Sequence, residues 1–93
     1  AAINLCRERH IPYWIGSMME SGISKMLHVQ LAALGDSYMA GGLSDSSRYF
    51  ERDLIYPDLS FRDGVMSVPD GDGLGVTVFD DRIEEYCVER RRL

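Results

Sequence analysis

One carboxylate, Glu20, lies in a stretch that is suited to hold an active-site group. The stretch covers residues 12–24 and reads PYWIGSMMESGIS: a short apolar run that ends in glycine, a turn with the acid, and the start of a helix. A strand–turn–helix step of this kind places polar groups at the mouth of an α/β barrel, where the chemistry of such barrels takes place. We therefore consider Glu20 as an active-site carboxylate, against the alternative that it stabilises the following helix through its dipole.

The same turn offers backbone donors. Gly16 and Ser17 leave N–H groups that could cradle an anionic group such as a substrate carboxylate, although the pattern alone favours a plain tight turn. Met18 and Met19 adjoin the turn and could line an apolar pocket, although packing explains scattered methionines equally well. The turn thus offers groups for binding but no complete catalytic set.

Other candidate groups have simpler explanations. The glycine-rich loop at 71–75, GDGLG, precedes a predicted strand rather than a helix, so it does not fit a dinucleotide-binding loop. His28 lies two-thirds along a predicted helix, and we interpret it as a packed or surface histidine rather than a base. Asp45, Arg48 and Asp53 are interpreted as ion-paired residues with a structural role.

The composition excludes several function classes. The chain has 93 residues, of which 45% are hydrophobic and 27% charged, as in an ordinary soluble domain, and no apolar run is long enough to span a membrane. The net charge of −5 argues against nucleic-acid binding, and the basic run at 90–92 is interpreted as a solvated helix end. Cys6 and Cys87 lack the spacing of metal ligands, so we expect two reduced thiols in a cytoplasmic protein.

Two further features bear on completeness. The first residue is Ala1 rather than Met, and we expect the chain to begin inside a longer protein. It contains nine arginines but a single lysine, Lys25. A mechanism that needs two lysines therefore cannot run on this chain alone.

The hydrophobic pattern predicts the elements that would position Glu20. Residues 1–10 are predicted to end a helix, and the β-branched and aromatic run 11–15 is predicted to be a strand buried on both faces. A helix over 22–34 follows, with an apolar stripe of Ile23, Leu27, Leu31 and Leu34, widened by Met26 and Val29. Gly35 is predicted to end the helix, and 37–40 to form a second strand, so the order strand–helix–strand indicates a parallel sheet.

The second half of the chain is predicted to be less regular. Residues 44–53 fit a short helix or an ordered loop, and 59–68 fit a hairpin that turns at Asp63-Gly64. Residues 76–78 are predicted as a strand, and Asp80 as the cap of a final helix over 81–91 whose inward side carries Ile83, Tyr86 and Cys87. One strand–helix–strand unit with a hairpin cannot bury both faces of its strands, so we expect a slice of a larger domain.

Four stretches together resemble the carboxyl-terminal quarter of the o-succinylbenzoate synthases. They are IPYWIGSMMESGIS, LHVQLAAL, LSDSSRYFERDLI and VPDGDGLGVTV. These synthases belong, with the N-acylamino-acid racemases, to the muconate-lactonizing branch of the enolase superfamily. The resemblance covers almost the whole chain, in order and with matching spacing.

The resemblance implies an α/β fold, the carboxyl-terminal part of a (β/α)7β TIM-like barrel that carries a separate α+β capping domain. In that layout 11–15 is strand seven, 22–34 is helix seven and 37–40 is strand eight. Residues 1–57 would belong to the barrel. Residues 58–93 would form a hairpin and helix that return to the capping domain and pack on it.

The resemblance also implies a site. Gly16, Ser17, Met18 and Glu20 fall on the family's substrate-binding turn after strand seven. Family enzymes bind Mg²⁺ through three acidic ligands on earlier strands, and two lysines act as acid–base groups on a proton α to a carboxylate. None of these ligands or lysines falls on this segment, and Lys25 is not at a catalytic position. The chain is therefore expected to hold no catalytic and no metal-binding residue of its own.

For the whole protein, the resemblance implies dehydration of a cyclohexadiene carboxylate to o-succinylbenzoate in menaquinone biosynthesis. The alternative is an N-acylamino-acid racemase or another racemase or cycloisomerase of the branch. Dipeptide epimerases carry an Asp-x-Asp pair near the end of strand eight, where this chain has Gly42 and Ser44, so that reaction is disfavoured.

The expected partners follow from the same resemblance. They are a small-molecule carboxylate, the rest of the barrel and the capping domain, whereas neither a nucleic acid nor a membrane is expected; a homo-oligomer stays open. The 93 residues alone are expected to be inactive. A second alternative is that they act alone as a small non-catalytic binding domain.

Overall fold

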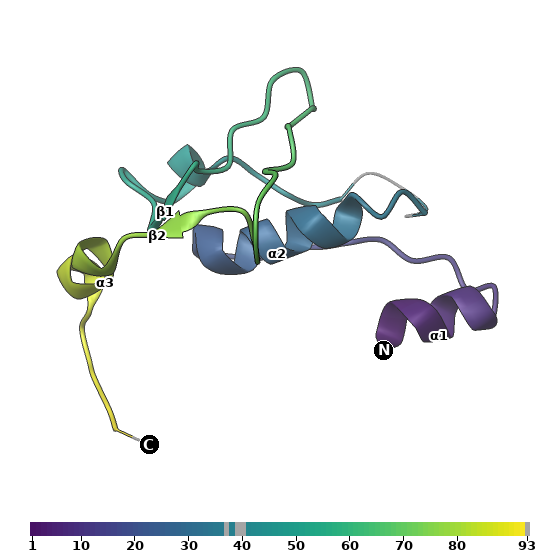
Figure 1. Cartoon of the computed structure of the whole chain (residues 1–93), viewed down its shortest axis with the longest axis horizontal. Helices are drawn as coiled ribbons and strands as arrows, with labels where there is room; N and C mark the ends of the chain where they lie inside the picture. The colour runs from purple at the N-terminus through teal and green to yellow at the C-terminus, as the bar shows by residue number, and fades with distance from the viewer. Residues whose placement is uncertain (37, 39–40, 93) are drawn as a thin grey trace.

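The computed structural model describes residues 1–36, 38 and 41–92. The elements in these residues, in chain order, are α1 (Ala2–Glu8), α2 (Gly22–Ala32), the 3-10 helix η1 (Ser46–Arg48), β1 (Ile55–Tyr56), β2 (Thr77–Val78) and α3 (Asp80–Tyr86). In Figure 1, α2 lies at the centre, and α1 and α3 lie at opposite ends. The arrangement is open: the radius of gyration is 14.9 Å, whereas about 12 Å is typical of a compact domain of this length.

The core lies between α2 and the segment that contains β1. Four apolar side chains are buried in the described part of the chain: Met26 and Val29 from α2, Ile55 from β1, and Leu59. This is a small core for a chain of 93 residues, because a domain of that size ordinarily buries well over half of its surface.

The buried face of α2 is not the stripe predicted from the sequence. Gly22, Met26 and Val29 follow one another at helical spacing and are buried. Leu27 and Leu34, which belong to the predicted stripe, are 47% and 50% exposed. The segment that contains β1 packs on the side of α2 that carries Met26 and Val29. These two residues, which the pattern predicts only to widen the stripe, are therefore the buried ones.

The predicted parallel sheet is not formed among the described residues. The run 11–15 is extended but is not a strand, and two backbone hydrogen bonds join it to the segment after α2. Tyr38 N–H donates to the carbonyl of Tyr13 at 2.7 Å, and Gly42 N–H donates to the carbonyl of Ile15 at 3.0 Å. Both segments run in the same direction, as in a parallel pair, but two bonds are too few for a ladder. The strand predicted at 37–40 lies, except for Tyr38, outside the described residues.

The predicted turn at Asp63-Gly64 is confirmed. Both residues have positive φ, 52° and 76°, as a type I′ turn requires. Arg62 and Val65 exchange both backbone hydrogen bonds around it, at 2.8 and 3.0 Å. The flanking runs form this single bridge rather than two paired strands.

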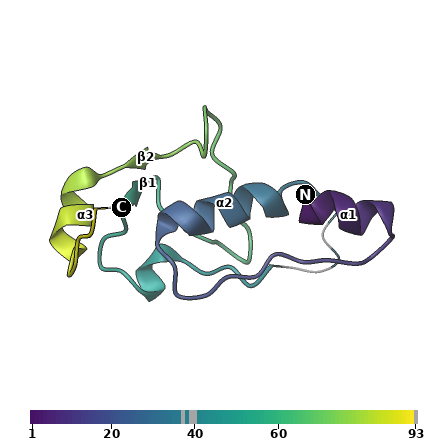
Figure 2. The ribbon, with the colours of Figure 1, turned by 90° about the horizontal axis from the view of Figure 1, so that it is seen from below.

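The antiparallel pair of the structure is instead β1 with β2. Ile55 faces Val78, and Tyr56 faces Thr77. The strand predicted at 76–78 is thereby confirmed in its last two residues. Its partner, β1, was not predicted. Figure 2 shows the pair beside the first turn of α2, between α2 and α3.

The helix ends differ from the prediction by a few residues. Gly35 has a φ of 83°, which confirms the predicted left-handed stop after α2. Phe79 is the N-cap of α3, so Asp80 lies in the first turn instead, where its carboxylate still favours the helix dipole. The helix ends at Tyr86 rather than near residue 91, because Cys87 is extended, and none of its residues is buried.

The short element predicted in 44–53 is present as η1, and the helix predicted before residue 10 is present as α1. After α1, the chain runs back along α2 before α2 begins, as Figure 2 shows. This return path brings the predicted turn at 16–20 to the first turn of α2. Among the described residues, every helix is too short or too polar to cross a membrane.

Candidate functional site

The four predicted substrate-binding residues lie on one turn before α2. The Ser17 hydroxyl donates to Oε2 of Glu20 at 2.9 Å, and the Glu20 N–H donates to the carbonyl of Met18 at 3.0 Å. The Glu20 side chain is 29% exposed, and Met18 is exposed. The turn thus presents a hydrogen-bonded carboxylate and an apolar side chain, while Gly16 opens it.

A second loop closes against this turn. Gly42 N–H bonds to the carbonyl of Ile15, and a Cβ on Gly42 would lie 3.9 Å from both the Cα of Gly16 and the backbone N of Ser17. The ring of Trp14 covers both glycines, since a Cβ on either would lie 3.4 Å from it. The loop at Gly42 therefore lies close to the turn, with room at either glycine for little more than a Cβ in ordinary van der Waals contact.

A buried carboxylate, Asp53, fixes the start of α2 beside the turn. Its side chain is 2% exposed. Oδ1 accepts hydrogen bonds from the N–H of Gly22 at 2.9 Å and of Leu54 at 2.6 Å. Oδ2 accepts from the hydroxyl of Ser46 at 2.5 Å, and that hydroxyl oxygen accepts from the N–H of Leu59 at 2.9 Å. Asp53 therefore satisfies the first N–H of α2, which the helix itself cannot do.

Asp45, Arg48 and Asp53 make other contacts than the predicted ion pairs in the described part of the chain. Oδ1 of Asp45 accepts a hydrogen bond from the N–H of Phe61 at 2.7 Å. The guanidinium of Arg48 lies 5.9 Å from the centroid of the Tyr49 ring. The acids hold backbone groups in place, so their role is structural, as expected, but it does not depend on the pairing that the sequence suggested.

Lys25 is 1% exposed and lies on the buried face of α2. Its Nζ donates to the hydroxyl of Ser44 at 3.1 Å and lies 4.5 Å from the centroid of the Tyr49 ring. The ammonium group therefore ties the loop after Gly42 to the first turns of α2.

His28 lies beside the turn, which sequence reasoning missed. Its Nδ1 is 3.4 Å from Oε2 of Glu20. This nitrogen is buried and makes no hydrogen bond within the described part of the chain, so the contact has the distance of an ion pair without the angles of a hydrogen bond. The sequence does not predict the contact of His28 with Glu20, because it depends on how residues 17–20 fold back along α2.

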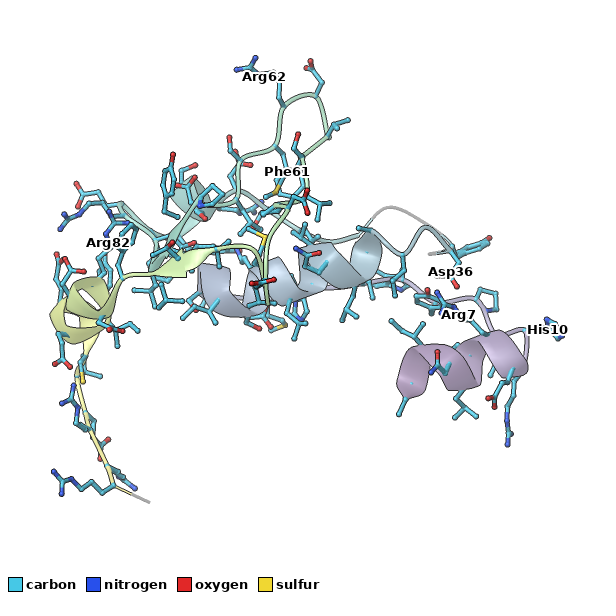
Figure 3. All side chains as sticks on the ribbon, in the orientation of Figure 1. Arg7, His10, Asp36, Phe61, Arg62 and Arg82 are labelled. Carbon is cyan, nitrogen blue, oxygen red and sulfur yellow. The ribbon has the colours of Figure 1, made fainter. Side chains whose placement is uncertain are left out.

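A second polar cluster joins α1 to the segments on either side of α2. Asp36 accepts hydrogen bonds from Nε of Arg7 and from the hydroxyl of Tyr13. These bonds, first that of Arg7 and then that of Tyr13, lower the pKa of Asp36 to about 2. The bond to Asp36 raises the pKa of both Arg7 and Tyr13. Figure 3 shows Arg7 and Asp36 together at the α1 end, with His10 pointing away.

Mg²⁺ has no suitable site in the described residues. No group of three or more His, Cys, Asp or Glu side chains lies close enough there to hold a metal ion. The turn combines one carboxylate with a histidine and a serine, whereas Mg²⁺ in proteins is bound mainly through carboxylates and other oxygen ligands in octahedral geometry. The donor set of this turn suits hydrogen bonding rather than binding of a hard cation.

Comparison with known proteins places these features in a family. Residues 1–82 match the family described as "Enolase C-terminal domain-like". Over 86 residues, the chain is 41% identical to the o-succinylbenzoate synthase of Bacillus subtilis, which covers 92% of the chain and 23% of that enzyme. It is 39% identical over 72 residues to the N-succinylamino acid racemase of Thermus thermophilus, covering 77% of the chain and 20% of the racemase.

Solved structures agree. A member of the enolase superfamily from Enterococcus faecalis superimposes with a TM-score of 0.79 at 34% identity, covering 89% of this chain and 22% of that one. A member from Listeria innocua gives a TM-score of 0.78 at 30% identity, with the same coverage. The resemblance seen in the sequence is confirmed, and the chain spans less than a quarter of the length of these relatives.

Proposed function

Because the chain belongs to the enolase C-terminal domain-like family, we propose that it forms the carboxyl-terminal part of an enolase-superfamily enzyme and lines its substrate pocket. The observation that carries this proposal is the turn at 16–20. It places the backbone N–H groups of Gly16 and Ser17 and the hydrogen-bonded carboxylate of Glu20 on one short loop, beside which the loop at Gly42 lies. Such convergence of polar groups beside apolar side chains is typical of small-molecule sites.

We propose a role for each residue of the turn. The N–H groups of Gly16 and Ser17 bind a carboxylate of the substrate, because successive backbone donors in a turn form an anion-binding concavity. Met18, which is 78% exposed, packs against the apolar body of the substrate. Glu20 accepts a hydrogen bond from a donor on the same substrate. These residues bind and orient, and none of them transfers a proton.

The packing supports a place within a larger domain. The buried core consists of four apolar side chains in the described residues, and Leu27 on α2 and Leu34 just after it remain about half exposed. We propose that neighbouring barrel elements cover this apolar surface. On this proposal residues 1–57 belong to the barrel, with 11–15 as its seventh strand and α2 as its seventh helix, and 58–93 return to the capping domain.

For the whole protein, we propose dehydration of a cyclohexadiene carboxylate to o-succinylbenzoate, a step of menaquinone biosynthesis, in the cytoplasm. Five relatives that are 33–41% identical to the chain over more than 80 residues are named o-succinylbenzoate synthase. The acid–base lysines and the acidic ligands of Mg²⁺ are proposed to lie on the remainder of the protein. An N-acylamino-acid racemase is the second candidate, because relatives from Thermus and Amycolatopsis are named N-succinylamino acid racemase.

A chimera tests the proposal. Residues 1–82 replace the matching segment of the Bacillus subtilis synthase, and the purified chimera is assayed for dehydration and for racemisation of an N-succinylamino acid. We expect measurable dehydration that is lost when Gly42 is replaced by Val, since a branched side chain there meets the Trp14 ring and the turn. A folded chimera that catalyses neither reaction would contradict the proposal, and racemisation without dehydration would favour the second candidate.

The third reading, a small non-catalytic binding domain, makes an opposite prediction about the isolated chain. A domain that folds alone shows a cooperative thermal transition and a fixed near-ultraviolet signal. We expect neither from the 93 residues alone, because of their small core. A sharp transition would support the binding domain.

A further inference from the structure

His28 stands out among the groups that the proposed function does not use. Its side chain is 23% exposed, and its Nδ1 is buried without a hydrogen bond in the described part of the chain. Buried polar atoms are nearly always satisfied, so an unsatisfied one calls for an explanation. It lies 3.4 Å from Oε2 of the carboxylate of Glu20.

Two side chains meet one oxygen of that carboxylate. The hydroxyl of Ser17 donates to Oε2 of Glu20 at 2.9 Å, and Nδ1 of His28 lies near the same Oε2. Ser17 comes from the turn and His28 from the second turn of α2, so side chains of two different elements approach this oxygen. With Oε2 engaged in this way, Oε1 is the oxygen left to meet a ligand.

The position of His28 supports a role at the turn. The imidazole lines a cavity of about 350 Å³ together with Ile3 and Cys6 of α1 and with Trp14 and Gly16. It therefore touches the space behind the turn, where α1 and α2 approach each other. An apolar side chain would fill this mainly apolar cavity equally well, so packing alone does not explain a nitrogen facing Glu20.

We propose that His28 is a positioning residue for Glu20. Together with Ser17 it fixes Oε2, so that Oε1 faces a hydroxyl or amide N–H donor of the bound carboxylate substrate. This rests on the proposed function. The negative charge of Glu20 repels a negatively charged substrate. Glu20 can therefore lie beside such a substrate only where a hydroxyl or amide N–H of the substrate donates a hydrogen bond to it. His28 sets this orientation and does not touch the substrate.

Kinetics of the full-length enzyme test the proposal. Asparagine can place an amide nitrogen close to the position of Nδ1, whereas leucine cannot donate. We expect His28→Leu to raise KM about tenfold, because Glu20 then loses the orientation in which Oε1 accepts a hydrogen bond from the substrate, with kcat within about twofold. His28→Asn restores most of the lost affinity. The control is Gln30→Leu on the same helix, which loses hydrogen bonds to Pro69 and Leu74 and lowers stability without changing KM.

The effect must also depend on Glu20. In a Glu20→Gln background the amide still fills the site but carries no charge, and we expect His28→Leu to add less than about a twofold change in KM. An equal rise in KM in both backgrounds, or no rise in the single variant, overturns the proposal. Equal loss of affinity in the Gln30→Leu control also overturns it, because His28 would then act through stability alone.

A second measurement is independent of activity. The ¹⁵N chemical shift of His28 Nδ1 is expected to change on Glu20→Gln and to stay unchanged on Glu8→Gln, an exposed acid of α1. A full-length protein that is inactive on both substrates contradicts the proposed function. In that case the shift alone decides about His28: an unchanged shift overturns the positioning contact, and a changed shift supports it.

Discussion

The carboxylate of Asp53 accepts a hydrogen bond from the backbone N–H of Gly22 at 2.9 Å, although 31 positions separate the two residues. Gly22 is the first residue of α2, and Glu20 lies two residues before it. Asp53 thus connects the segment after η1 to the turn proposed to bind substrate. Loss of this buried hydrogen bond is therefore expected to displace the turn at 16–20.

Replacing Asp53 tests this connection. Asp53→Ala leaves the N–H of Gly22, the N–H of Leu54 and the Ser46 hydroxyl without their acceptor in a buried place. We expect a loss of about 2–4 kcal/mol in the free energy of unfolding, measured by denaturant titration of the full-length protein. Asp45→Ala is the matched control, since its side-chain bond to Phe61 is part-buried, and a smaller loss is expected there. Equal losses of unfolding free energy in the two variants would contradict the proposed role of Asp53 in fixing the start of α2.

Gly22→Ala tests how closely the two segments pack. Alanine favours a helix over glycine by about 1 kcal/mol, so a helix free of contacts would gain stability. Here a Cβ would lie 2.5 Å from Oδ2 of Asp53 and 2.6 Å from a side-chain carbon of Ile55. We expect a net loss of about 1–3 kcal/mol from overpacking. Gly35→Asn is the control at an open position, where only the φ of 83° opposes a side chain, and a smaller loss is expected because asparagine tolerates the left-handed region. A stabilised Gly22→Ala variant would contradict the packing.

A double-mutant cycle tests the buried contact of Lys25 with Ser44. Ser44→Ala leaves the ammonium group with the Tyr49 ring and without its hydroxyl acceptor, and we expect a loss of about 1–3 kcal/mol. Lys25→Met keeps an unbranched chain in place and removes the charge, so the double variant is expected to be more stable than Ser44→Ala alone. Strict additivity in denaturant melts would indicate that the two side chains do not interact.

The cluster of Asp36, Arg7 and Tyr13 predicts a pH dependence. The pKa of Asp36 falls from 3.8 to about 2 in the folded chain. A lowered folded pKa adds stability that is fully present above the unfolded value and is lost as the pH falls from about 4 to about 2. We expect Asp36→Asn to reduce the slope of unfolding free energy against pH in this window, with no change in slope between pH 5 and 7. Asp63→Asn, at the exposed turn, is the control, and an equal change in its slope would refute the assignment.

The local features of the fold could be predicted from the sequence because they depend on near neighbours. The helix α2 follows from apolar spacing, and the turn at Asp63-Gly64 follows from residues that tolerate positive φ. The left-handed Gly35 has the same basis. In each case the physical cause lies within a few residues of the effect.

Features that depend on distant segments could not be predicted. Whether Leu27 or Val29 is buried depends on which segment packs on α2, and both fit a helical stripe. The strand β1 has only two residues and takes its partner from more than twenty positions away. The run 11–15 has the composition of a parallel strand, but a strand also needs regularly paired neighbours.

The candidate site divides in the same way. The turn from Gly16 to Glu20 is continuous in sequence, so its residues could be named together. The sequence predicts only packing for His28 and ion pairing for Asp53. Their contacts with the turn and with α2 form only when the chain folds back. Sequence spacing carries no information on such contacts.

A crystal structure of the full-length protein with o-succinylbenzoate bound tests most directly whether this chain supplies a wall of the substrate pocket. We expect a carboxylate of the product within hydrogen-bond distance of the N–H groups of Gly16 or Ser17, with Glu20 facing the same cavity. Product bound in a closed pocket to which the 16–20 turn contributes no atom would contradict it.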